Sequence, residues 1–331
     1  MSLLDIRNLS IYSRDNPADR LVDRISLSLN EGEILALVGE SGSGKSLVAQ
    51  AITGQLDDDW QVSAERIAFD DIDLLHIEHD QHRLLLGSQI AIIFQDPVSG
   101  LNPIARIGEQ LLESLPDERP WWRPHRRERR QQLISALHQV GIRDHARLIN
   151  AFPHEISSGL CQKVMIAMAI ARKPRLLIAD EPTTGMEPGT QGQILRLLAK
   201  LNQLNKMSLL VLSHDIHTAS RIANRLAVLY CGQIVESGSS DSLSTLPFHP
   251  YTHALLHAVP DASEAPRSPL AELRGSMPQR DNLPIGCRLG PRCPEARREC
   301  VLMPELMRDK ERNYRCHFPL NQRPEAEDDE L

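Results

Sequence analysis

A glycine-rich segment near the N-terminus carries the residues best suited to chemistry. It reads Gly-Glu-Ser-Gly-Ser-Gly-Lys-Ser and fits the pattern G-x-x-x-x-G-K-S. Glycines let the backbone curl until successive N–H groups point at phosphate oxygens, and the N-terminus of a following helix adds partial positive charge. We expect Lys45 to reach the β- and γ-phosphates and Ser46 to ligate Mg²⁺. The sequence therefore predicts a nucleotide phosphate loop formed by Gly39, Glu40, Ser41, Gly42, Ser43, Gly44, Lys45 and Ser46.

Two carboxylates follow an apolar run much later in the chain. Residues 176–179 read Leu-Leu-Ile-Ala, and Asp180 and Glu181 come next. We expect Asp180 to join the Mg²⁺ shell, as such aspartates do in nucleotide hydrolases. Glu181 is the candidate general base that polarises the attacking water. A strand capped by two acids is the plain alternative, and the phosphate loop makes it the weaker one.

Two further polar residues end apolar runs. Gln95 follows residues 90–94, and His214 follows residues 209–213. Either residue taken alone is more often a surface residue. Taken with the phosphate loop and the carboxylates, both become candidate members of one catalytic site.

The elements that must position these residues alternate along the first 240 residues. Short apolar runs are separated by helical patterns, which predicts an α/β fold with a mainly parallel sheet. The expected strands cover residues 33–38, 90–94, 176–179 and 209–212, a hairpin covers 226–236 with its turn at Cys231-Gly232, and a helix covers 46–54. Residues 97–172 are helix-rich without a convincing strand. We interpret them as an inserted helical subdomain.

The order of these motifs resembles the ATP-binding-cassette (ABC) ATPases. The resemblance implies that Gln95 contacts Mg²⁺ and water and signals to a membrane partner, and that His214 contacts the γ-phosphate. Residues 156–163 occupy the signature segment of this family. The resemblance implies that Ser157, Ser158 and Gly159 face the ATP bound to the opposite subunit of a dimer.

Some residues depart from the family pattern. Ser158 replaces a signature glycine, Leu160 replaces its glutamine, and Glu187 stands where the family usually has aspartate. These residues would serve the partner's nucleotide, so hydrolysis there is in question. An aromatic residue near the N-terminus normally stacks on adenine in this family. Tyr12 is the only tyrosine there, but the family spacing points nearer Ser13, so a surface tyrosine is an equal alternative.

The C-terminal part narrows the resemblance. Residues 249–256 read His-Pro-Tyr-Thr-His-Ala-Leu-Leu, and 12 of the 22 prolines fall after Leu246. Both features resemble the ATPases of oligopeptide, dipeptide and nickel transporters, closest to those linked to antimicrobial-peptide sensitivity. We expect an ABC ATPase domain at 1–246, an irregular Cys-rich C-terminal module at 247–320 and an acidic tail at 321–331.

Four cysteines gather in this module with the spacing C-x5-C-x6-C-x15-C. Four thiolates bind zinc or an iron–sulfur cluster, and the spacing leaves zinc, iron–sulfur and unliganded thiols open. The transporter resemblance implies a 4Fe-4S cluster. The candidate ligands are Cys287, Cys293, Cys300 and Cys316.

Composition limits the function classes. The chain has 24% charged and 41% apolar residues and a net charge of −7, so it is no polyanion binder and we expect no nucleic-acid partner. We find no run of 18 apolar residues and no apolar core for a signal peptide, which predicts a cytosolic chain.

We expect an ATP-binding and hydrolysing subunit that energises a multi-subunit peptide-type transporter, bound peripherally to the cytoplasmic face of the bacterial inner membrane. Its expected partners are a second, nonidentical ABC ATPase subunit, two membrane permease subunits and, indirectly, a periplasmic substrate-binding protein. The alternatives are a soluble non-transport ABC ATPase and a regulatory subunit with low hydrolysis. The segment between phosphate loop and signature is too short for the coiled coil of DNA-repair types, and translation types carry two cassettes.

Overall fold

The computed structural model describes residues 2–17, 19–116, 126–258, 273, 275–279 and 282–321. Of the acidic tail predicted at 321–331, only Asn321 belongs to the described residues.

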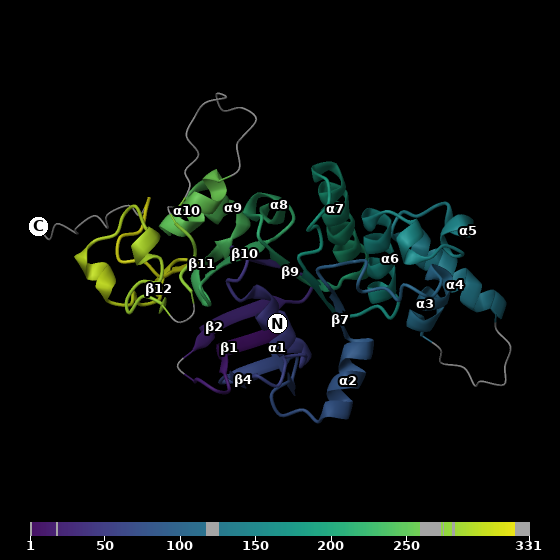
Figure 1. Ribbon diagram of the computed structural model, residues 1–331, viewed down its shortest axis with the longest axis horizontal. Helices are drawn as coiled ribbons and strands as arrows, with labels where there is room; N and C mark the ends of the chain where they lie inside the picture. The colour runs from purple at the N-terminus through teal and green to yellow at the C-terminus, as the bar shows by residue number, and fades with distance from the viewer. Residues whose placement is uncertain are drawn as a thin grey trace, which may run out of the picture.

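An eight-stranded sheet runs through the described part of the molecule in the order β12-β13-β11-β10-β3-β9-β8-β7 (Figure 1). Neighbouring strands from β10 to β7 are parallel, which confirms the predicted α/β class. These strands are β3 (Ile34–Val38), β7 (Ile90–Ile93), β8 (Leu176–Asp180), β9 (Ser208–Ser213) and β10 (Arg225–Tyr230).

The central strands are apolar throughout because both faces of the sheet are covered. On β3, Leu35 and Leu37 join the core on one side, and Ala36 and Val38 join the core on the other. Helix α1 (Lys45–Thr53) packs into the first core through Val48, together with the N-terminal strands.

A second, antiparallel sheet covers that face of the central sheet (Figure 1). It contains β1 (Ser2–Ser13), β2 (Arg20–Asn30), β4 (Trp60–Ser63), β5 (Arg66–Phe69) and β6 (Ile72–Asp73). Helix α2 (His79–Ser88) leads from it to β7. The sequence patterns predicted none of these five strands.

Helices dominate the chain between β7 and β8. They are α3 (Ile107–Ser114), α4 (Arg126–Gln139), α5 (His145–Leu148) and α6 (Ser158–Ile170), and they lie together at one end of the molecule (Figure 1). The described part of residues 97–172 contains no strand. The exact bounds of a subdomain stay a prediction.

After β8 the chain alternates again, through α7 (Pro188–Asn205), β9, α8 (Ile216–Ser220) and β10. Strands β10 and β11 (Gln233–Ser239) form the predicted antiparallel hairpin. Its turn residues Cys231 and Gly232 have φ angles of 45° and 77°, which is the backbone of a two-residue hairpin turn. Helices α9 (Ser240–Thr245) and α10 (Pro250–His257) follow.

The Cys-rich segment is mainly irregular, with short 3-10 turns at Gly290–Arg292 and Arg298–Val301. Two of its short segments nevertheless extend the central sheet. β13 (Arg312–Tyr314) pairs with β11, and β12 (Met307–Asp309) pairs with β13. The sequence did not predict these strands, and the C-terminal segment therefore shares a sheet with the nucleotide-loop strand β3.

Candidate active site

The phosphate loop connects the carboxyl end of β3 to α1. Gly44 caps the helix with a φ of 108°, a conformation that side chains rarely adopt, and it gives the helix no side-chain cap. A Cβ atom at Gly39 would lie 2.1 Å from the carbonyl oxygen of Leu229. The first four N–H groups of α1 have no acceptor inside the helix, which suits them to an anion. The loop thus joins a strand to a helix, as the sequence predicted, and its binding of phosphate stays a prediction.

Lys45 folds back over this loop. Its side chain is only 3% exposed, and its Nζ donates to the carbonyl oxygens of Gly39 at 2.8 Å and Glu40 at 3.1 Å. Nζ also lies 3.6 Å from Oε1 of Glu181. Burial lowers the pKa of Lys45, and the Glu181 carboxylate opposes that shift. The ammonium group is therefore held where strand β3 ends.

Ser46 and Asp180 place a hydroxyl oxygen and a carboxylate oxygen next to each other. The Ser46 hydroxyl donates to Oδ1 of Asp180 at 3.1 Å. Burial raises the pKa of the Asp180 carboxyl, while the hydrogen bond from Ser46 opposes the shift. A hydroxyl beside a carboxylate is a donor set that suits a hard cation such as Mg²⁺. A bound cation would also hold Asp180 in its ionised form.

Glu181 is the centre of a hydrogen-bonded cluster. Its Oε2 accepts hydrogen bonds from Gln95 Nε2 at 2.9 Å and from the Thr184 hydroxyl at 2.8 Å. Nδ1 of His214 lies 3.4 Å from the same oxygen, and the His214 side chain is 51% exposed. Glu181 has a φ of 45°, and strained backbone of this kind concentrates at functional sites.

The structure therefore brings together six predicted residues from four strand ends: Gln95 after β7, Asp180 and Glu181 at β8, His214 after β9, and Lys45 and Ser46 after β3. They meet because parallel strands present their carboxyl ends at one edge of a sheet. Thr184 was missed by the sequence analysis. Its place three residues after Glu181, in a tight turn, is the signal that could have found it.

The signature segment lies at the N-terminus of α6. Ser157 caps the helix by accepting from the Leu160 N–H, and Ser158 is exposed at its first turn. Gly159 lies close to Thr190 of α7. These residues, all within the described part of the chain, make no hydrogen bond or ion pair to the cluster around Glu181. Their contact with the nucleotide of an opposite subunit stays a prediction.

Tyr12 lies on β1 and lines a cavity of about 550 Å³ with Gln61 and Arg24. No phosphate-loop residue lines that cavity. A separate cavity of about 560 Å³ adjoins the loop at Gly42, and Tyr12 is not among its lining residues. Arg20 lines both cavities, and the stacking of Tyr12 on adenine stays a prediction.

The four tail cysteines are half-buried thiols. Burial raises the pKa of Cys287, of Cys293 to about 11 and of Cys316 to about 12, and the charges of neighbouring cysteines add to each shift. Cys300 contributes to all three of these effects, so the four thiols lie within electrostatic range of one another. No three His, Cys, Asp or Glu side chains among the described residues form a group that could hold a single metal ion.

Comparisons with known proteins identify the chain. The ABC transporter family profile matches residues 22–184, and that of the oligopeptide/dipeptide transporter C-terminal region matches residues 235–300. The peptide transport system ATP-binding protein SapD of Salmonella typhimurium is 51% identical over 327 residues, covering 97% of this chain and 99% of SapD. The chain belongs to the ABC transporter ATPases.

Similarity to further ABC proteins supports this family assignment. The dipeptide transport ATP-binding protein DppD of Escherichia coli K12 is 42% identical and covers 97% of this chain and 98% of its own. Among solved structures, cbiO1 from Clostridium perfringens has a TM-score of 0.63 at 26% identity over 73% of this chain and 90% of its own. The dimeric bacterial ABC transporter cassette MJ0796 has a TM-score of 0.62 at 25% identity over 72% of this chain and 98% of its own.

These findings confirm the predicted ABC fold and family. They give no support to the alternative of a soluble non-transport ABC ATPase. No helix in the described residues is both long and apolar enough to span a membrane.

Proposed function

We propose that this chain is the ATP-hydrolysing subunit that energises a peptide-type ABC transporter. The observation that carries the proposal is the cluster around Glu181, in which an ammonium group, a glutamine amide, a hydroxyl and an imidazole converge on one carboxylate. The 51% identity to SapD, a peptide transport system ATP-binding protein, supports the peptide class.

Each residue of the site has a separate role in binding or hydrolysing ATP. Lys45 and the N–H groups of the phosphate loop bind the triphosphate, and His214 contacts the γ-phosphate. Ser46, Gln95 and Asp180 hold Mg²⁺, which neutralises charge on the phosphates when it is bound. Glu181 accepts a proton from the attacking water, and Gln95 and Thr184 orient its carboxylate by hydrogen bonds.

The active unit is a dimer of two cassettes, in which the α6 end of one subunit faces the nucleotide of the other. The exposed position of Ser157 and Ser158, and the dimeric form of the similar MJ0796 cassette, support this arrangement. A serine Cβ at position 158 hinders the close backbone approach that glycine would allow. A nonidentical partner with a regular signature would complete the site on Lys45 and Glu181.

The four tail cysteines bind a 4Fe-4S cluster. A cluster spreads four thiolates over four irons, and the match to the oligopeptide/dipeptide transporter C-terminal region supports this proposal. Anaerobically purified protein should contain iron and acid-labile sulfide near four each per chain. Stoichiometric zinc without sulfide would refute the cluster.

The transporter context implies two membrane permease subunits and a peripheral position on the cytoplasmic face of the inner membrane. The match to the transporter C-terminal region at residues 235–300 supports this. The test is to purify the chain together with its co-expressed permease subunits and measure ATP hydrolysis while adding peptides. Stimulated hydrolysis is expected. A complex that binds ATP but hydrolyses it no faster in any condition would instead favour a regulatory subunit.

A further inference from the structure

The Cys-rich segment contacts the phosphate loop directly, at Glu40. Nη1 of Arg292 lies 3.2 Å and 3.1 Å from the two carboxylate oxygens of Glu40. The same nitrogen donates to the Tyr230 hydroxyl at 3.3 Å, and the guanidinium carbon lies 5.8 Å from the centre of the Tyr230 ring. The Arg292 side chain is only 9% exposed and that of Glu40 is 30% exposed, so water reaches this pair mainly from the carboxylate side.

The main chain of Glu40 is held from the C-terminal side as well. Its N–H donates to the hydroxyl of Tyr251 at 2.8 Å. Tyr251 belongs to the His-Pro-Tyr-Thr segment at the start of α10, is fully buried, and packs against Tyr230 with ring centres 4.6 Å apart. Residues after 246 therefore bind both the backbone and the side chain of one phosphate-loop residue.

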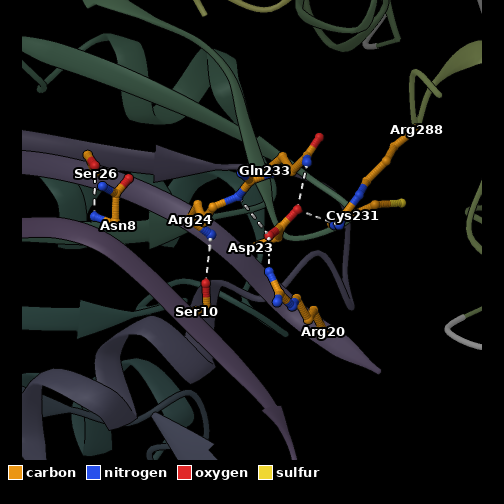
Figure 2. A network of polar contacts seen from close by, with 9 residues as sticks. All are labelled: Asn8, Ser10, Arg20, Asp23, Arg24, Ser26, Cys231, Gln233 and Arg288. Carbon is orange, nitrogen blue, oxygen red and sulfur yellow. Dashed lines mark hydrogen bonds and ion pairs between the residues drawn. The ribbon is translucent and has the colours of Figure 1, made fainter. Parts of the chain in front are cut away.

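A second buried arginine anchors the segment that carries Arg292. Arg288 donates to the carbonyl oxygen of Cys231, and its Nη2 lies 2.9 Å from Oδ2 of Asp23 (Figure 2). Gln233 donates to the same Asp23 oxygen at 2.9 Å. Burial acts to raise the pKa of Asp23, but the hydrogen bond from Gln233 and the charge of Arg288 lower it overall. The anchor is therefore an ion pair.

This anchor also touches the phosphate loop through the hairpin turn. The Gly232 N–H donates to the carbonyl oxygen of Ser43 at 2.8 Å, and the Asp23 N–H donates to the carbonyl oxygen of Gly232 at 2.9 Å. Arg288 directly follows Cys287 in the chain, and Arg292 directly precedes Cys293. Arg292 is the last residue of the short 3-10 turn at Gly290–Arg292. The backbone that carries two candidate cluster ligands thus also carries both arginines.

We propose that Arg292 is a positioning residue for ATP: it neutralises and holds the Glu40 carboxylate so that the phosphate loop accepts the triphosphate. The proposal rests on the proposed function. An unpaired carboxylate in this loop would repel the phosphates of the nucleotide and would be free to turn toward them. The hydrogen bond from the Glu40 N–H to Tyr251 holds the backbone of the residue whose side chain Arg292 binds. The C-terminal segment therefore acts on nucleotide affinity rather than on the chemical step.

The test is equilibrium binding of a non-hydrolysable ATP analogue with Mg²⁺ to the full-length chain. Arg292→Gln should weaken binding by about tenfold or more, because it leaves the Glu40 charge unpaired. Arg292→Lys should lie between this variant and the wild type, because it keeps a charge but loses the planar guanidinium. Arg308→Gln, an exposed arginine of the same segment, is the control and should bind as the wild type does.

The double variant Glu40→Gln/Arg292→Gln separates positioning from a general effect on folding. Removal of the carboxylate should restore binding toward that of Glu40→Gln alone. In the assembled transporter, Arg292→Gln should raise KM for ATP more than it lowers kcat.

Two results would overturn the inference: Arg292→Gln binding within about twofold of the wild type, or a double variant no better than Arg292→Gln. If Arg292→Gln does not fold, Arg292→Lys and the comparison of the double variant with Glu40→Gln decide the question. A wild-type chain that binds no analogue would refute the proposed function instead.

Discussion

The carboxylate of Glu181 receives contacts from four side chains. Gln95 and Thr184 orient it, and Lys45 and His214 lie at 3.6 and 3.4 Å from its two oxygens. Glu181→Gln keeps the size and some of the hydrogen bonds but removes the base. We expect hydrolysis to fall by about 10²–10⁴-fold while ATP binding remains.

The measurement is steady-state hydrolysis alongside equilibrium ATP binding, in a complex that contains only the variant chain. Glu78→Gln, the same change at an exposed position, is the matched control. Near-normal turnover of Glu181→Gln would show that another group is the base.

Several residues that local sequence patterns predicted for the site lie together in the structure. Lys45 and Ser46 end a glycine pattern, and Asp180 ends an apolar strand, so their positions followed from neighbouring residues. The pair Arg292–Glu40 spans 252 residues and leaves no local pattern in either segment. Long-range ion pairs of this kind depend on how the whole sheet folds, and sequence patterns do not report them.

At the scale of elements, the start of α10 makes stability depend on pH. His249 is 1% exposed, and its Nδ1 accepts the Tyr251 N–H at 3.1 Å as the helix cap. The main-chain N–H of His249 donates to the buried Glu236 carboxylate. Burial lowers the pKa of His249 to about 3, below the ordinary value near 6.5, so the imidazole is neutral in the folded chain.

Below pH 6.5 the unfolded chain therefore binds a proton at His249 that the folded chain does not. This contribution to stability is complete above pH 6.5 and falls by about 1.4 kcal/mol per pH unit as the pH drops toward 3. His249→Asn keeps a capping oxygen without a titrating group. Between pH 7 and pH 5 the wild type should lose about 2 kcal/mol more than His249→Asn, measured from denaturant midpoints. Equal losses would contradict this.

Strands made of continuous apolar runs could be predicted from the sequence, whereas short or polar strands could not. The apolar runs of β3, β8 and β9 gave their positions because both faces of these strands are buried. Strands β12 and β13 read Met-Arg-Asp and Arg-Asn-Tyr, too short and too polar to form a pattern. β13 forms on the edge of β11 and β12 forms on β13, so both strands depend on backbone partners that only the folded sheet provides.

At the scale of the molecule, two unequal ATP sites are expected. A dimer of identical chains would pair each Lys45 loop with the Ser158 segment, whereas a nonidentical partner with glycine there would complete this chain's site. We predict that Glu181→Gln in the assembled transporter costs more activity than the equivalent change in the partner ATPase, and that this chain alone hydrolyses ATP weakly. Equal losses from the two changes, together with full activity of the isolated chain, would defeat the heterodimer.

The pairing of β13 with β11 also has a consequence for the order in which the protein is made. Synthesis runs from the N-terminus, so β11 emerges long before residues 312–314 do. Until then its outer backbone groups form an open edge, which is a template for pairing with another chain. Among the described residues, the sheet ends on this side with β12, whose Arg308 and Asp309 make a short charged edge that resists further pairing. A chain interrupted before Arg312 should therefore aggregate through β11, whereas a chain that contains β12 and β13 should not.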